Sequence, residues 1–272
     1  MSKTHLGHRA RKRFGQNFLN DEHIIESIVD AIHPQPGENL VEIGPGLAAL
    51  TEPVAERCQQ LRVVELDRDL ADRLETHPFL SQHLDVIRGD AMKIDFKAFA
   101  SPEQKLRVFG NLPYNVSTQI LASLIMLKDW PPWYDNLILM FQKEVADRII
   151  AKPNTKEFSR LTVLSNWRLE IKKHFDVSKN SFFPKPKVNS TILSFKPKKN
   201  NLLNLRNPKN LEKVTQVLFS SRRKMINKNL KKLFKEKLFL LNNLNIDLNK
   251  RPEELSNETF YKIAIEYEKL FD

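Results

Sequence analysis

The residues best suited to chemistry lie in one short run, Gly110 to Asn115, which follows an apolar segment. The Asn111 amide and a carbonyl group at Pro113 can accept hydrogen bonds from an exocyclic amino group, and these bonds leave the nitrogen lone pair directed at an electrophile. The Tyr114 ring can stack on a nucleobase that has left its helix. No strong base is needed, because the substituted ammonium loses its proton readily. The alternative is an ordinary turn built on asparagine and proline.

A second stretch, Val41 to Thr51, carries two glycines one residue apart after an apolar run. Glycine lets the backbone approach a ligand closely, and a helix that begins after such a turn offers free N–H groups. The spacing Gly44-x-Gly46-x-x-Ala49 also fits the dinucleotide fingerprint, so NAD, S-adenosylmethionine and a plain strand–helix turn all remain open. Glu42, two residues before the first glycine, would repel a pyrophosphate and attract a sulfonium or amino group, which favours S-adenosylmethionine.

Both stretches follow predicted strands in an alternation of strands and helices. Apolar periodicity predicts strands at residues 39–43, 61–65, 84–87, 106–109, 137–141 and 188–195, and helices at 47–57, 68–76, 117–128 and 143–150. Glu65 and Asp90 stand at the ends of the second and third strands, where carboxylates could hold ribose hydroxyls and an adenine amino group. Solvated loop acids are the alternative. This order predicts an α/β, Rossmann-like fold whose ligand lies at the carboxyl ends of parallel strands.

Charge is distributed unevenly along the 272 residues. Residues 1–150 contain 17 Lys and Arg against 21 Asp and Glu, whereas residues 151–272 contain 27 against 12. A domain with such an excess of positive charge commonly meets a phosphate backbone. Cys58 is the only cysteine, which excludes an intrachain disulfide. The sequence has no cluster of Cys and His residues that would predict a zinc site. Because the sequence has no apolar run of about 20 residues and no signal peptide core, we expect a cytoplasmic protein.

Composition and periodicity divide the chain into three parts. Residues 1–20 are basic, and their aromatic and amide residues suggest an ordered lid rather than a disordered tail or a transit peptide. Residues 21–200 carry the alternation of strands and helices, and residues 201–272 form a smaller, all-helical domain. That domain carries a cationic stripe suited to RNA phosphates, with a plain solvated face as the alternative; it includes Arg222, Arg223, Lys224 and Lys228.

Together, these motifs resemble the ribosomal RNA adenine dimethyltransferases. The match rests on Gln16-Asn17-Phe18-Leu19, Glu42-Ile43-Gly44-Pro45-Gly46, Glu65-Leu66-Asp67, Gly89-Asp90-Ala91 and Asn111-Leu112-Pro113-Tyr114. Within that family, residues 11–19, 142–145 and 182–188 are similar to the KsgA (RsmA) small-subunit type rather than to the Erm resistance type. The resemblance covers nearly the whole chain, and its motifs together are far more specific than the glycine turn.

For the methyl donor, the resemblance implies a role at each matching position. The cofactor would be S-adenosylmethionine. Asn17 and Leu19 would close over it, and Gly44 would line its amino-acid end. Glu65 would hold the ribose hydroxyls, and Asp90 would accept a hydrogen bond from the adenine amino group.

For the target base, the resemblance implies a catalytic motif made of Asn111, Leu112, Pro113 and Tyr114. Asn111 would contact both the donor and the target adenine. Tyr114 would stack on one face of that adenine, and Phe182 would stack on the opposite face.

The implied activity is methyl transfer to the N6 atoms of two adjacent adenosines in the loop of the 3′-terminal hairpin of small-subunit rRNA. The partner would be an assembling small ribosomal subunit, and the enzyme a monomer. An NAD-dependent oxidoreductase is one rival, although none of the seven histidines lies in the motifs. An RNA-binding assembly or transcription factor without the chemistry is the other, against which the intact 111–114 motif argues. The family pattern is broken at Ser159 and at 183–186, near the domain junction and the target loop.

Overall fold

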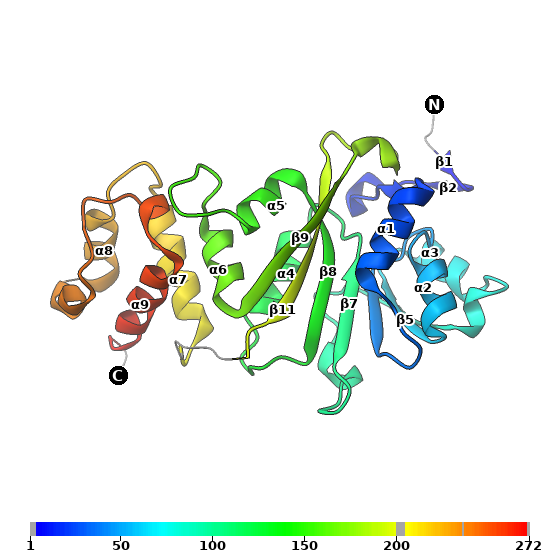
Figure 1. Ribbon diagram of the computed structural model, residues 1–272, viewed down its shortest axis with the longest axis horizontal. Helices are drawn as coiled ribbons and strands as arrows, with labels where there is room; N and C mark the ends of the chain where they lie inside the picture. Colours follow the sequence, from blue (N-terminus) through cyan, green and yellow to red (C-terminus); the bar gives the residue numbers. More distant parts are fainter. Residues whose placement is uncertain (1–3, 200–204, 236, 271–272) are drawn as a thin grey trace. The chain divides into compact units, whose positions relative to one another are not determined.

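The structure, a computed structural model, describes residues 4–199, 205–235 and 237–270, without the side chains of five of them (Figure 1). The side chains of His5, Arg9 and Lys12, part of the basic arm, therefore lie outside the described residues. The main sheet has the strand order β6-β5-β4-β7-β8-β11-β9, and two small ribbons pair β1 with β2 and β3 with β10. The strands are β1 (Thr4–His5), β2 (His8–Arg9), β3 (Phe18–Leu19), β4 (Leu40–Ile43), β5 (Leu61–Glu65), β6 (Leu84–Arg88), β7 (Leu106–Gly110), β8 (Tyr134–Gln142), β9 (Leu169–Val177), β10 (Phe182–Phe183) and β11 (Ser190–Pro197).

The sheet confirms the predicted Rossmann-like α/β fold, with one difference in direction. β4, β5, β6, β7 and β8 are parallel as expected, but β11 pairs antiparallel with β8, so the sheet is mixed. The strand order reverses between β4 and β7, where open α/β sheets hold their ligands. Gly110 permits this junction, since a Cβ atom there would overlap the Ile43 carbonyl oxygen.

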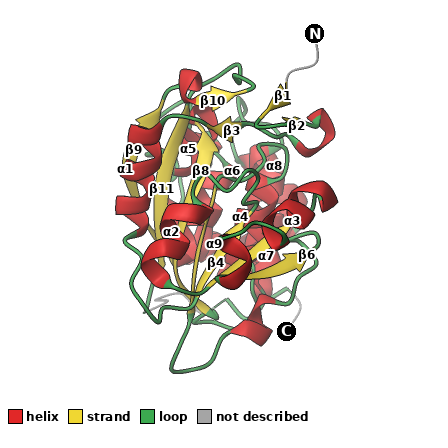
Figure 2. Cartoon of the chain, turned by 90° about the vertical axis from the view of Figure 1, so that its right-hand side faces the viewer, coloured by secondary structure: helices red, strands yellow, loops and turns green. Residues whose placement is uncertain are grey.

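Helices follow most of the strands and bury one apolar face each. In α1, for example, Ile28, Val29 and Ile32 are buried at helical spacing. α2 packs against β5, and α3 packs against β5 and β6; Figure 2 shows α3 beside β6. The α-helices are α1 (Glu22–Ile32), α2 (Thr51–Cys58), α3 (Arg68–Glu75), α4 (Ser117–Ile125), α5 (Lys143–Ile149), α6 (Arg160–Arg168), α7 (Pro208–Phe219), α8 (Asn227–Phe234) and α9 (Asn257–Glu268). Short 3-10 helices are η1 (Lys12–Phe14), η2 (Leu80–Gln82), η3 (Phe96–Phe99), η4 (Lys179–Ser181), η5 (Leu238–Leu244) and η6 (Pro252–Glu254).

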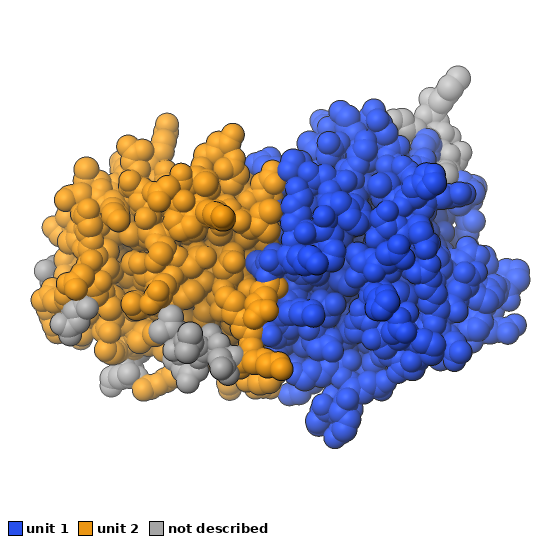
Figure 3. Space-filling model, in the orientation of Figure 1, with its two compact units in different colours: residues 1–121, 132–146, 171–197 blue, residues 122–131, 147–170, 198–272 orange. Residues whose placement is uncertain are grey.

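The chain forms two compact units, coloured separately in Figure 3. Unit 1 comprises residues 1–121, 132–146 and 171–197 and holds most of the sheet; unit 2 comprises 122–131, 147–170 and 198–272 and is mainly helical. The proposed division at residues 1–20, 21–200 and 201–272 remains a prediction, and its second boundary falls among residues that are not described. Across the described ranges, helices that combine the length and apolar character of a membrane span are absent.

Candidate active site

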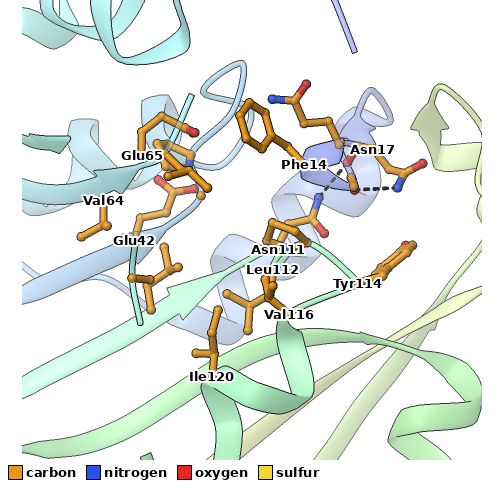
Figure 4. A pocket seen from close by; sticks show the side chains of 18 of the residues that line it. Phe14, Asn17, Glu42, Val64, Glu65, Asn111, Leu112, Tyr114, Val116 and Ile120 are labelled. Atoms are coloured by element: carbon orange, nitrogen blue, oxygen red, sulfur yellow. Dashed lines mark hydrogen bonds between the residues drawn. The ribbon is translucent and has the colours of Figure 1, made fainter. Parts of the chain in front are cut away.

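One pocket in unit 1 brings together the predicted cofactor-binding residues and the 111–114 motif (Figure 4). It is built from the carboxyl ends of β4, β5 and β7, the turn after β6, and arm residues 13–19. The predicted cofactor-binding residues all line it: Asn17, Leu19, Gly44, Glu65, Asp90 and Asn111. Leu112, Pro113 and Tyr114 line it as well. Residues nearly a hundred positions apart therefore share one cavity.

The glycine turn after β4 is tight, but the helix does not start where expected. Gly44 and Gly46 have φ values of 74° and 60°, in the region that favours glycine, and a Cβ atom on Gly46 would lie 3.2 Å from the Phe18 ring. Ala48 also has a left-handed φ, 69°, which interrupts helical geometry. The helix predicted over 47–57 begins only at Thr51. The N-terminal N–H groups of α2 therefore do not directly follow the glycines.

Glu65 is fixed by the backbone around it. Its Oε2 accepts a hydrogen bond from the Gly46 N–H at 3.1 Å, and its Oε1 accepts one from the Asp67 N–H at 2.8 Å. The side chain is buried, which raises the pKa of its carboxyl group above the ordinary value. Each carboxylate oxygen can accept a further hydrogen bond, so a preoriented acceptor pair faces the pocket.

Glu42 is the most enclosed acid in the pocket. Its side chain is 1% exposed, and its Oε2 has no hydrogen-bond partner within the described chain. Burial, reinforced by the charge of Glu65, raises the pKa of Glu42 to about 8, and the nearby Thr51 hydroxyl offsets part of that rise. The Thr51 Oγ1 is itself buried without a hydrogen-bond partner in the described part of the chain. An acid left unsatisfied at a pocket wall suits a ligand that brings positive charge or donors.

The charged residues of the lining test what kind of ligand fits. Among the described lining residues, three are acids, Glu42, Glu65 and Asp90, and one is a base, Arg13, whose side chain is exposed. Fully ionised, this lining is negative, which disfavours the pyrophosphate of NAD and favours a cationic ligand. The residues present therefore fit the methionine end of S-adenosylmethionine, which carries a sulfonium and an ammonium group.

Asn111 connects the catalytic motif to the arm. Its side-chain amide donates a hydrogen bond to the Asn17 carbonyl oxygen at 3.0 Å, and the Asn17 amide donates one to the Gly15 carbonyl oxygen at 3.1 Å (Figure 4). One of the two amide N–H groups of Asn111 is thus bonded to protein, which fixes the direction of its Oδ1 acceptor. An acceptor held in this way is what an exocyclic amino group requires.

Tyr114 is positioned through its hydroxyl. The Tyr114 hydroxyl and the Ser190 Oγ lie 2.6 Å apart in a hydrogen bond, and burial raises the pKa of Tyr114. The ring is partly exposed and lines the pocket. Anchoring the hydroxyl on β11 leaves a ring that is fixed in direction, as a stacking surface must be.

The basic arm is held over the pocket by one buried acid. Arg11 Nη1 lies 2.7 Å from Asp67 Oδ1, and Gln16 Nε2 donates a hydrogen bond to Asp67 Oδ2 at 3.0 Å. Arg11 also pairs with the exposed Asp69. These contacts place Phe14 and Gln16 in the pocket lining, which the sequence had not assigned to the site. Their presence in the Arg11–Leu19 run was the available signal.

Phe182 lies away from the pocket in this structure. Its side chain is 2% exposed, belongs to the apolar core and pairs across the β3–β10 ribbon with Leu19. Among the described residues, Leu19 and Phe18 of β3 line the pocket, but their partners on β10, Phe182 and Phe183, do not. Stacking by Phe182 on a target base stays a prediction and requires this ring to be uncovered.

The cationic stripe divides into two kinds of residue in unit 2. Arg223, Lys224 and Lys228 are exposed and line a cleft together with Lys231 and Arg251, a base that the local charge run did not reveal. Arg222 instead turns inward. Its Nε lies 3.2 Å from Glu253 Oε2, and its Nη2 donates to the carbonyl oxygens of residues 155 and 156. Three of the four predicted RNA-binding residues thus remain open to a partner.

Comparison with known proteins gives the family. The model of the family described as ribosomal RNA adenine dimethylase matches residues 7–269. The chain belongs to this family. This confirms the resemblance of the motifs and the prediction of a methyltransferase.

Curated relatives of this dimethylase carry names that agree with the family. A protein of Colwellia psychrerythraea named "Ribosomal RNA small subunit methyltransferase A" is 47% identical over 262 residues, which cover 96% of this chain and 85% of the relative. A protein of Idiomarina loihiensis with the same name is 47% identical over 263 residues, covering 97% and 89%. Their names match the small-subunit type that the motifs favoured.

Solved structures support the fold of the dimethylase chain. A dimethyladenosine transferase from Plasmodium falciparum superposes with a TM-score of 0.76 at 24% identity, covering 93% of this chain and 98% of that one. The 23S rRNA methyltransferase ErmE has a TM-score of 0.66 at 22% identity, with 93% and 100% covered. At these identities the likeness concerns the fold, which is the Rossmann-like methyltransferase architecture.

Proposed function

We propose that this protein transfers methyl groups from S-adenosylmethionine to the N6 atoms of two adjacent adenosines in the loop of the 3′-terminal hairpin of small-subunit rRNA. The product would be N6,N6-dimethyladenosine. The family and the names of the curated relatives support this substrate. One structural observation carries the proposal: an acid-lined pocket and the Asn111–Tyr114 motif share one cavity.

The donor would lie along the strand ends. Each carboxylate oxygen of Glu65 is already oriented by a backbone N–H, and this carboxylate would accept hydrogen bonds from the ribose hydroxyls. Asp90 would accept a hydrogen bond from the adenine amino group. Gly44 and Glu42 would lie at the methionine end, and Asn17 and Leu19 would cover it from the arm. When bound, the donor supplies an electrophilic methyl group.

The target adenine would enter beside Asn111. Its N6 amino group would donate to the Asn111 Oδ1 and to a carbonyl group at Pro113, which holds the nitrogen lone pair toward the methyl donor. Tyr114 would stack on the base, and Phe182 on its other face. The methylated nitrogen is acidic and loses its proton without a strong protein base. Catalysis would therefore depend mainly on alignment.

The basic cleft of unit 2 would position the RNA. Arg223, Lys224 and Lys228 are suited to phosphates, which fix register while the flipped base supplies specificity. Arg222 would support this surface from behind. An assembling small subunit as partner, action as a monomer, a cytoplasmic location and the three-part division of the chain belong to the same proposal.

The proposal is tested by separating subunit binding from methyl transfer. Unmethylated small subunits and labelled donor are incubated with the wild type and with Asn111→Ala, and subunit binding is measured in parallel. We expect the variant to bind subunits normally and to lose about a hundredfold in turnover, because a misplacement of about 1 Å can have that effect. Donor binding without methyl transfer by the wild type would instead favour an RNA-binding assembly factor.

A further inference from the structure

We propose that Glu42 holds a proton in the free pocket and releases it when the cationic methyl donor binds, so that donor recognition is linked to one protonation event. This inference rests on the proposed function, because it takes S-adenosylmethionine as the ligand. It adds a protonation event to a residue that the pocket already places beside the methionine end of the donor.

The surroundings of Glu42 make its charged form costly. It lies on β4 at 1% exposure, and its Oε2 is buried without a hydrogen-bond partner among the described residues. Its register neighbours are apolar, Val63 on β5 and Phe109 on β7. A buried carboxylate without donors is strongly disfavoured against the neutral acid.

The other groups that face Glu42 do not compensate its charge. From α2, Thr51 contributes only a hydroxyl. From β5, Glu65 contributes a second acid that repels it, and Asp90 adds negative charge elsewhere in the lining. Arg13, the base of the lining, has an exposed side chain. These conditions raise the pKa of Glu42 to about 8, so the acid is mostly protonated at neutral pH.

A cationic ligand reverses this balance. The donor carries a sulfonium and an ammonium group at its methionine end, and a positive charge next to a buried carboxyl favours the ionised form. The pKa of Glu42 would fall in the complex, and its proton would pass to solvent. A neutral competitor of similar shape would bring no such gain, so the same residue would help to select the charged donor.

The sign of the pH dependence follows directly. Below the pKa of the free protein, donor binding must displace a proton, so the affinity rises with pH by up to about tenfold per unit. The measurement belongs between pH 6 and 7, where an α-amino group, with a pKa of about 7.7 to 8, stays protonated.

The experiment is calorimetric titration of the full chain with S-adenosylmethionine at pH 6.5, in buffers of different ionisation enthalpy. We expect nearly one proton to be released per donor bound by the wild type and almost none by Glu42→Gln. Glu52→Gln is the matched control, since Glu52 is an exposed acid in the first turn of α2, and it should behave as the wild type.

If Glu42→Gln fails to fold, the pH dependence and proton release measured on the wild type still test the inference. Donor affinity that is flat between pH 6 and 7, with no proton released, would overturn this inference and leave the proposed function intact. A wild type that does not bind the donor under any condition would instead refute the proposed function. Proton release that persists in folded Glu42→Gln would assign the event to another group and also overturn the inference.

Discussion

Two adjacent arginines, Arg222 and Arg223, should fail in different ways when each is replaced by alanine. Sequence gives them the same chemistry, but the structure directs Arg222 to Glu253 and two backbone carbonyl groups, and leaves Arg223 exposed in the basic cleft. Replacing each arginine in turn therefore separates a structural role from the proposed RNA contact at two neighbouring positions.

The magnitudes follow from these contacts. Arg222→Ala removes a partly exposed ion pair, worth about 0.5 kcal/mol, and charged hydrogen bonds to carbonyl oxygens, worth about 1 kcal/mol more after allowance for exposure. Arg223→Ala removes a surface side chain and should change the free energy of unfolding by less than about 0.5 kcal/mol. One lost phosphate contact should lower the log–log salt slope of RNA binding by about 0.7 to 0.9.

The assays are denaturant unfolding and RNA binding at several salt concentrations. We expect Arg222→Ala to lower the unfolding midpoint with little change in the salt slope of RNA binding. Arg223→Ala should lower the salt slope with little change in the unfolding midpoint. Lys224→Ala serves as a second exposed control. Loss of RNA affinity in Arg222→Ala at unchanged stability would show that Arg222 contacts RNA directly and that its role is not structural.

Three further predictions concern the pocket of unit 1. Glu65→Ala and Asp90→Ala should each weaken donor binding by about 1 to 3 kcal/mol, the range for a charged hydrogen bond, with RNA binding unchanged; titration with donor and with RNA checks both. Tyr114→Ala should lose about 1 to 3 kcal/mol of base stacking, measured as methyl incorporation, whereas Tyr114→Phe should lose much less because the ring remains. Burial raises the pKa of Glu42 above its unfolded value, so its contribution to stability is lost as pH rises toward about 8. The thermal midpoint of the donor-free protein should therefore fall between pH 5 and 8, and less so in Glu42→Gln.

The sequence predicted the strands of the site well, because each is an apolar run that ends at a glycine or an acid. β4, β5 and β7 appear within one or two residues of the expected positions. β9, Leu169–Val177, was missed. It is an edge strand with five charged or histidine side chains among nine residues, so its pattern lacks the apolar alternation of a half-buried strand.

Other features depend on three-dimensional contacts that local patterns do not encode. The left-handed Ala48 delays α2, although alanine is a good helix former. Arg222 and Arg223 are indistinguishable in sequence, and they are separated by the positions of Glu253 and of the carbonyl groups of residues 155 and 156, which bind Arg222. The late start of α2 and the inward direction of Arg222 are therefore findings of the structure.

Mapping of the modified bases would show whether this pocket methylates two neighbouring adenines. Small subunits that lack the modification are incubated with the protein and labelled S-adenosylmethionine, and their rRNA is digested and analysed by mass spectrometry. We expect N6,N6-dimethyladenosine at two adjacent positions in the 3′-terminal hairpin loop and none with Asn111→Ala. Methyl groups on another base, at another site or absent despite donor binding would contradict it.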